Sequence, residues 1–170
     1  MKKPLMRAAA AAVADVLARV PGVTISRNGG PGTTTNVFLR GAEGRFTAVF
    51  IDGVRIDSQS TGGATWNAIP LSQVERIEVL RGPAAAIYGS DALAGVVQIF
   101  TREGEGGFFP SVRAGWGSDA TRTLGVALRG GAAEVDYAFG VGTERSDGFN
   151  AHLQGNPDRD GYRNENLSGR

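Results

Sequence analysis

The sequence predicts an α+β fold in which a small mixed sheet with short helices is followed by antiparallel strands. Short β-rich runs alternate with glycine-bearing loops over about the first hundred residues, and longer alternating segments separated by tight turns follow residue 107. Glycine accounts for 26 of the 170 residues, about twice its ordinary usage of roughly 7%. This composition is typical of a chain with many turns and short strands.

Composition excludes several classes of function. Eighteen Lys and Arg residues balance seventeen Asp and Glu residues, and because neither sign gathers in one part of the chain, nucleic acid is not an expected partner. The chain has no cysteine and one histidine, His152, so disulfides, thiolate metal sites and multi-histidine zinc sites are excluded. No apolar run is long enough for a spanning helix, so a membrane role would require strands.

The N-terminus has two interpretations, a signal peptide or a short helix. Lysines followed by alanines suggest a signal peptide, but the uncharged stretch covers only residues 8–14. Apolar residues instead recur at helical spacing and end at a Pro-Gly stop. These are Val13, Val16, Leu17 and Val20, followed by Pro21-Gly22. The spacing favours the helix.

The first hundred residues also contain several strand signals. Runs 23–26 and 36–41 are β-rich, and Asp52-Gly53 between 47–51 and 54–56 predicts a hairpin, because such a turn requires positive φ. Pro70 predicts a short helix through about Val74.

Two further strands and two long loops complete this part of the chain. Residues 76–82 alternate as in a strand, and 95–101 have the composition of a buried strand. Loops 27–36 and 57–67 are either binding loops or simple connections, since long loops are often functional. A phosphate cradle in the first loop is not expected, because no GxxxxGK[ST] motif is present.

From Phe109 onward, three successive segments carry one apolar face and one small or polar face. The apolar sets are Val112, Ala114 and Trp116, then Leu124, Val126 and Leu128, then Val135, Tyr137, Phe139 and Val141. Alternating strands with a small or polar second face are typical of transmembrane barrels, but an ordinary antiparallel meander has a similar pattern. From this segment alone both interpretations stay open.

Nearly the whole chain resembles the plug domain and first barrel strands of a TonB-dependent outer-membrane receptor. The resemblance rests on ADVLARVPGVTIS (14–26), NVFLRG (36–41), VFIDGVRI (49–56) and, most specifically, IPLSQVERIEVLRGPAAAIYGSDALAGVVQIFTR (69–102). The NGGPG loop, the hairpin and RAGWGS (113–118) most resemble the cobalamin receptor type, with siderophore receptors next. The implied domains are an N-terminally truncated plug, 1–106, and three to four strands of an incomplete barrel, 107–170.

The resemblance implies a transport role and a location in the outer membrane of a Gram-negative bacterium, in contact with its lipid. The plug would seal a barrel of about 22 strands, which has a wide lumen. It would help to bind cobalamin or a similar metal chelate and import it with energy from TonB and its ExbB-ExbD complex. The alternatives are a ferric siderophore receptor plug and a periplasmic binding fragment that does not transport. An enzyme is not expected, because no nucleophile and base combine.

Site residues also follow from the resemblance. Plug arginines of the family contact carboxylates of the barrel wall, which here implies Arg40 and Arg81, although Glu75 and Glu78 could instead hold Arg76 or Arg81 within the plug. The expected ligand contacts lie in apical loops and combine hydroxyl, amide and indole groups. They are Asn28, Thr33, Thr34, Ser58, Gln59, Ser60, Thr61 and Trp66.

A calcium site is the last feature that the resemblance implies. Asp158 and Asp160, in PDRDGY, resemble the calcium-loop aspartates of cobalamin receptors, and carboxylates suit a hard cation, although such pairs are common in turns. No cofactor is otherwise required. Because three or four strands cannot close such a barrel, the chain is expected to be a fragment of a larger receptor.

Overall fold

The computed structural model describes residues 12–30, 32–58, 62–83, 85–104, 106–132, 135–150 and 159–170. The chain divides into two compact units, Met1–Arg27 with Thr34–Thr101, and Asn28–Thr33 with Arg102–Arg170. No helix among the described residues has the length and apolar character needed to cross a membrane.

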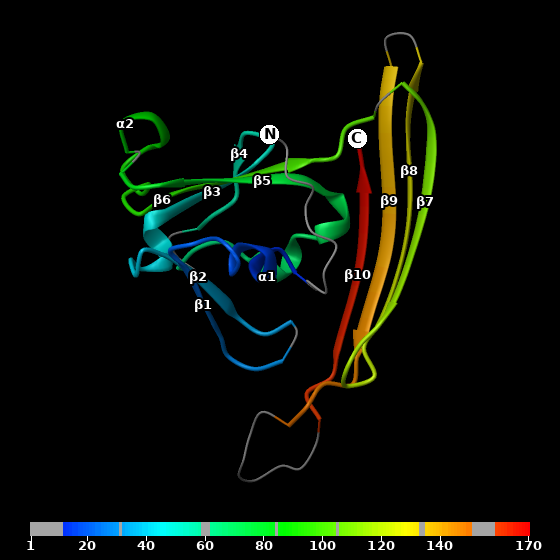
Figure 1. Ribbon diagram of the computed structural model, residues 1–170, viewed down its shortest axis with the longest axis horizontal. Coiled ribbons are helices and arrows are strands. Elements are labelled where there is room, and N and C mark those ends of the chain that lie inside the picture. Colours follow the sequence, from blue (N-terminus) through cyan, green and yellow to red (C-terminus); the bar gives the residue numbers. More distant parts are fainter. Residues whose placement is uncertain are drawn as a thin grey trace. The chain divides into compact units, whose positions relative to one another are not determined.

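The first unit contains a four-stranded mixed sheet, a two-stranded sheet and short helices (Figure 1). The strands are β1 (Val23–Arg27), β2 (Thr35–Leu39), β3 (Thr47–Ile51), β4 (Val54–Arg55), β5 (Val74–Arg81) and β6 (Gly95–Thr101). The helices are α1 (Val13–Leu17) and α2 (Ala85–Tyr88), with 3-10 turns at Gly44–Phe46, Trp66–Ala68 and Leu71–Gln73. The four-stranded sheet has the order β4-β3-β6-β5, in which only β3 and β6 run parallel.

The two central strands of this sheet are buried on both faces. Val49, Val97 and Ile99 face the main core, while Ala48 and Val96 face a second cluster. The second cluster is closed by the ring of Tyr88, whose centroid lies 5.6 Å from that of Phe50 and whose hydroxyl accepts a hydrogen bond from Gln98 Nε2 at 2.8 Å. The buried strand predicted over 95–101 is therefore confirmed.

Local chemistry explains most elements of the first unit. The helix predicted at the N-terminus is α1, whose Val13 and Leu17 are fully buried. Asp15 accepts the Ala12 N–H at 3.0 Å and pairs with Arg27 at 2.8 Å, so it joins α1 to β1. The hairpin prediction is also confirmed, since Asp52 and Gly53 connect β3 to β4 with φ of 47° and 82°.

Two predictions about this region are corrected. The helix expected after Pro70 is a single 3-10 turn, because β5 begins at Val74 and its pairing with β6 takes over the backbone hydrogen bonds. A helix over Ala85–Tyr88 was not predicted. Its four residues are too few to show helical periodicity in the sequence.

The second unit contains one antiparallel sheet of four long strands, in the order β10-β9-β8-β7 (Figure 1). The strands are β7 (Gly107–Trp116), β8 (Arg122–Ala132), β9 (Val135–Ser146) and β10 (Tyr162–Gly169). The first three correspond to the predicted alternating segments and extend beyond them. The register places Val112, Val126 and Val141 in one row across the sheet, with Leu167 beside them.

Candidate functional site

Loop 57–66 begins at a buried carboxylate that belongs to the predicted hairpin. Asp57, whose side chain is 3% exposed, accepts the Val49 N–H at 2.8 Å and a two-pronged hydrogen bond from Arg55, with Nε at 3.0 Å and Nη2 at 2.7 Å. The same Nη2 also donates to Asp91 at 2.8 Å. Arg55 therefore joins the hairpin to the segment after α2, and the start of the loop is fixed from three directions.

The electrostatics of this cluster favour the ionised forms. Burial opposes ionisation of Asp57, but the hydrogen bonds from Arg55 and from the Val49 amide, together with the charge of Arg55, outweigh it and lower the pKa of Asp57 below its ordinary value. The hydrogen bonds that Arg55 donates to Asp57 and Asp91 raise the pKa of Arg55. The cluster is therefore a charged, satisfied anchor rather than a poised acid or base.

The loop itself closes on a short bridge. Ser58 and Gly63 exchange two backbone hydrogen bonds, at 3.2 and 3.0 Å. The expected contacts Gln59, Ser60 and Thr61 lie outside the described residues, between these two positions. The bridge brings Ser58 and Gly63 together one residue after the Asp57 anchor.

Trp66 requires a correction. No core around this residue is evident from the sequence, and the resemblance implies that it covers an apolar edge of a ligand. Its side chain is only 4% exposed and belongs to the hydrophobic core with Val13, Leu17 and Leu39. The local sequence is polar, so only the tertiary packing of α1 and β2 reveals this role, and we leave Trp66 out of the proposed contacts.

The other expected loop, residues 28–35, is described in part. Asn28 and Thr34 are exposed. Thr33 folds back on Gly30. The N–H and the hydroxyl of Thr33 both donate to the carbonyl of Gly30, at 3.3 and 2.8 Å. This turn leaves the side chains of Asn28 and Thr34 open to a partner, whereas the hydroxyl of Thr33 is already used within the loop.

The two predicted contact arginines of the first unit converge on one turn. Arg81 Nη1 donates to the carbonyl of Pro21 at 2.8 Å. Arg40, with a φ of 53°, donates its N–H to the carbonyl of Gly22 at 2.8 Å, and its Nη1 lies 3.7 Å from the position that a Cβ on Gly82 would take. Both arginines are exposed. Strands β2 and β5 thus end with two forked donors beside the same turn.

The ion pairs on β5 resolve an alternative that the sequence left open. Glu78 pairs with Arg76 at 2.8 Å, and the guanidinium of Arg76 lies 3.6 Å from the centre of the Phe100 ring. Arg81 has the carbonyl of Pro21 as its partner instead. Glu78 therefore holds Arg76 within the first unit.

The sheet of the second unit has two chemically different faces. One face is exposed and mostly apolar, and the opposite face is more protected and small or polar. The first carries Val112, Trp116, Leu124, Val126, Phe139, Val141 and Leu167, and the second carries Thr123, Gly125, Ala127, Gly140, Gly142, Asn164 and Asn166. This alternation, over strands of about ten residues, is that of barrel strands with lipid outside and a polar lumen inside.

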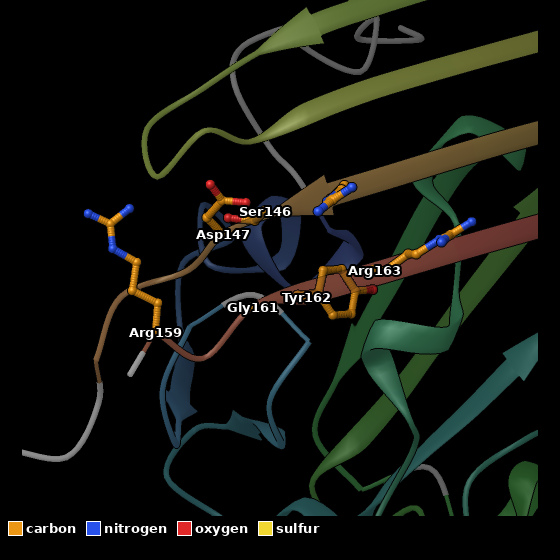
Figure 2. A pocket seen from close by; sticks show the side chains of 7 residues that line it. Ser146, Asp147, Arg159, Gly161, Tyr162 and Arg163 are labelled. Carbon is orange, nitrogen blue, oxygen red and sulfur yellow. The ribbon is translucent and has the colours of Figure 1, made fainter. Parts of the chain in front are cut away.

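The ends of β9 and β10 enclose a depression of about 510 Å³ (Figure 2). It is lined by Arg145, Ser146, Asp147, Arg159, Gly161, Tyr162 and Arg163. Ser146 is buried, and its hydroxyl accepts from Thr121 Oγ1 at 2.9 Å and donates to the carbonyl of Asp119 at 3.2 Å. This network fixes the base of the connection 147–161.

The expected calcium aspartates lie in that connection. Asp158 is outside the described residues, and Asp160 is exposed. Within the described ranges no three acidic or histidine side chains gather as metal ligands. Calcium binding by Asp158 and Asp160 therefore stays a prediction.

Together these features define a small α+β module followed by lipid-facing barrel strands, which is the architecture of a plugged outer-membrane receptor. Residues 2–96 match the model of the TonB-dependent Receptor Plug Domain. The chain belongs to this family, whose members are receptors and transporters of the Gram-negative outer membrane and not enzymes.

Relatives and solved structures agree with this placement. The chain is 42% identical over 160 residues to the vitamin B12 transporter BtuB of Photobacterium profundum, and 36% identical over 171 residues to that of Vibrio vulnificus. These matches cover 93% and 98% of the chain but only 26% and 27% of the relatives. The chain thus spans about a quarter of the length of the relatives it matches.

The structural matches include siderophore receptors. The ferric enterobactin receptor PfeA of Pseudomonas aeruginosa superimposes with a TM-score of 0.72 at 26% identity, over 96% of this chain and 28% of that one. The siderophore receptor PirA of Acinetobacter baumannii gives 0.69 at 26% identity, over 93% and 26%. The fold class, a plug with the first barrel strands, is therefore confirmed.

Proposed function

We propose that the chain supplies the plug and first barrel strands of an outer-membrane receptor that binds cobalamin or a similar metal chelate and imports it with energy from TonB. The observation that carries this proposal is the 42% identity to a vitamin B12 transporter along 93% of the chain. The anchored hairpin supports it, because Arg55 holds Asp57, at the start of a polar loop, through hydrogen bonds to Asp57 and Asp91. The contacts that we propose from described residues are Asn28, Thr34 and Ser58.

A ligand titration tests the substrate class. The intact receptor carrying this sequence is titrated with cyanocobalamin and, in parallel, with ferric enterobactin, and tryptophan fluorescence or calorimetry follows binding. We expect saturable binding of cyanocobalamin alone. Binding of only the ferric siderophore would favour the alternative that the PfeA and PirA structures suggest. Binding of neither compound would overturn the substrate proposal.

Loop variants test the contact residues. Replacing Asn28 and Thr34 by alanine removes an amide and a hydroxyl from exposed positions, and each lost hydrogen bond is expected to weaken binding by roughly fivefold, since a net hydrogen bond contributes about 1 kcal/mol. Thr24→Ala is the matched control, because Thr24 is exposed on β1, outside the two loops. Equal affinities for the double variant and the control would contradict the assignment of these contacts.

Energy coupling needs a separate measurement in cells. Uptake of labelled cobalamin by cells expressing the receptor is compared with and without TonB, and with and without the ExbB-ExbD complex. We expect binding to persist and uptake to disappear when either is absent. Binding without any TonB-dependent uptake would instead favour a binding protein that does not transport.

Calcium binding through Asp158 and Asp160 is a further proposal. Carboxylates from one turn can contribute to a calcium site when carbonyl oxygens complete it. We expect isothermal titration with Ca²⁺ to give a binding signal that Asp158→Asn with Asp160→Asn abolishes. An unchanged signal in this double variant would remove these aspartates from the proposal.

A further inference from the structure

Three arginines stand side by side in one row across the barrel strands. The strand register pairs Arg122 of β8 with Arg145 of β9, and Arg145 with Arg163 of β10. Residues directly opposite each other share a face of the sheet, and adjacent strands lie about 4.8 Å apart, so the row spans roughly 10 Å. Like charges in direct opposition destabilise a sheet. The row therefore needs a compensating negative charge.

The chain supplies little of that charge. Arg163 pairs with Glu165, and both side chains are well exposed, at 70% and 62%, so this surface pair contributes little. Among the described residues, no hydrogen bond or ion pair joins the guanidinium of Arg122 or Arg145 to a carboxylate. Asp147 lines the neighbouring depression, together with the further cation Arg159. Two adjacent cations of the row are thus left to an external partner.

The position of the row identifies the environment of that partner. Trp116, 81% exposed, pairs with Arg122 and continues the row onto β7. On the same face of β8 and β9, the pair next to Arg122 and Arg145 is Leu124 with Thr143. The pair after that is Val126 with Val141, where the face is apolar. A tryptophan beside cations at the end of an apolar face is the arrangement found at the level of lipid headgroups.

Loop lengths indicate the side of the membrane. The row lies at the end of the sheet where β7 joins β8 through 117–121 and β9 joins β10 through 147–161, whereas only two residues join β8 to β9 at the other end. Outer-membrane barrels have short periplasmic turns and longer extracellular loops. The row therefore faces the headgroups of the outer leaflet.

We propose that Arg122, Arg145 and Arg163 bind a lipid headgroup that carries more than one phosphate. Guanidinium groups match phosphate oxygens in forked geometry, and a shallow depression of about 440 Å³ lies over the row. Its lining includes Trp116, Arg122, Thr143, Arg145 and Arg163. The hydroxyl of Thr143 and the indole of Trp116 add a donor and an apolar edge beside the phosphates. The proposal depends on the barrel strands and not on the transported ligand.

Lipid retention tests this site. The intact receptor in detergent is titrated with bisphosphorylated lipid A, and native mass spectrometry counts the bound copies. Arg122→Gln with Arg145→Gln is expected to weaken binding about 25-fold, because each arginine near an anionic lipid surface contributes about fivefold. Arg113→Gln is the matched control, since Arg113 belongs to the same sheet on the opposite face and pairs with Gly125. Equal retention by the double variant and the control would overturn the proposal.

Additional measurements distinguish a lipid headgroup from a free anion as the partner. Lysine at positions 122 and 145 keeps the charge but not the fork, and is expected to recover part of the affinity. Monophosphorylated lipid A should bind more weakly than the bisphosphorylated form, and phosphatidylcholine weakest of all. If inorganic phosphate displaces lipid A completely at matched phosphate concentration, the row is a site for free anions and the lipid proposal is wrong.

Wild-type measurements keep the test independent of variant folding. Raising the ionic strength screens exposed charges and should release lipid A from the unmodified receptor, while retention that is insensitive to salt would contradict a phosphate site. Binding of cyanocobalamin, measured on the same samples, should be unchanged in the double variant. Loss of lipid with intact ligand binding, and the converse, therefore separate this site from the proposed transport function.

Discussion

At the scale of single residues, Asp57 has the strongest electrostatic role in the first unit. Its carboxylate is almost fully buried and is held by Arg55 and by the Val49 amide. Its pKa is lowered in the folded state, so it contributes stability at pH values above 3.8, its ordinary value, and that contribution is lost as the pH falls through the lower folded value. The hairpin should therefore weaken in acid.

Asp57→Asn is expected to destabilise the receptor by about 1–3 kcal/mol at neutral pH, because Arg55 loses its forked carboxylate partner. The loss should be constant from pH 5 to pH 7, and should shrink below about pH 4 as the wild-type carboxylate becomes protonated. Thermal unfolding at several pH values measures it. Glu78→Gln is the control, because it removes the ion pair with Arg76, in which the Glu78 side chain is 58% exposed. This substitution should have little effect on stability. If the difference in stability between the wild type and Asp57→Asn did not depend on pH, the ionised role of Asp57 would be contradicted.

Thr47, unlike Asp57, has a buried polar atom that no hydrogen bond compensates among the described residues. Its side chain is 1% exposed, and its hydroxyl oxygen has no hydrogen-bond partner in the part of the chain that the structure describes. Thr47→Val keeps the shape and removes the hydroxyl, so we expect stabilisation by about 1 kcal/mol. Thr47→Ser keeps the hydroxyl, loses a buried methyl and should destabilise by a similar amount. If valine also destabilises, the hydroxyl has a partner of its own.

At the scale of elements, the Asp52-Gly53 turn connects two strands and also reaches a third. Both residues have positive φ, as a two-residue hairpin turn requires. The Asp52 carboxylate accepts the N–H of Thr101 at 2.9 Å and also its hydroxyl. Gly53 has open space where a Cβ would stand, so a substitution there changes only the backbone energy.

Gly53→Ala is expected to cost about 1 kcal/mol, the penalty for placing a Cβ in the left-handed region. Gly106→Ala is the control, because Gly106 also faces open space and is not in that region. Chemical unfolding monitored by circular dichroism compares the two. An equal effect of both substitutions would show that the positive φ at Gly53 is not retained in solution.

Sequence reasoning recovered the elements that local chemistry determines. The Asp-Gly turn, the buried strand β6 and the alternation of the long strands follow from residue type and period, whereas the barrel interpretation came from the family resemblance. The burial of Trp66 could not be predicted, because it depends on α1 and β2, which are distant in the sequence. The arginine row was also missed, since only the register of β8, β9 and β10 brings its three members together.

At the scale of the whole molecule, the exposed arginines beside the Pro21-Gly22 turn are the proposed contacts between plug and barrel wall. Arg40→Ala with Arg81→Ala removes two forked donors, each of which contributes about 1.5–3 kcal/mol when bound to a carboxylate. We expect the pore to open in a planar bilayer at a urea concentration about 1 M lower than for the wild type. Arg76→Ala is the control, because Arg76 lies on the same strand but already pairs with Glu78.

Arg81 also donates to the carbonyl of Pro21, so the same substitution could act within the plug alone. The two roles differ in the order of events. If Arg81 holds the plug against the wall, conductance rises before the circular dichroism of the receptor changes, because a folded plug has become loose. If it only holds the Pro21-Gly22 turn, conductance and unfolding occur together. Conductance equal to that of the control throughout the urea range would exclude the wall contact.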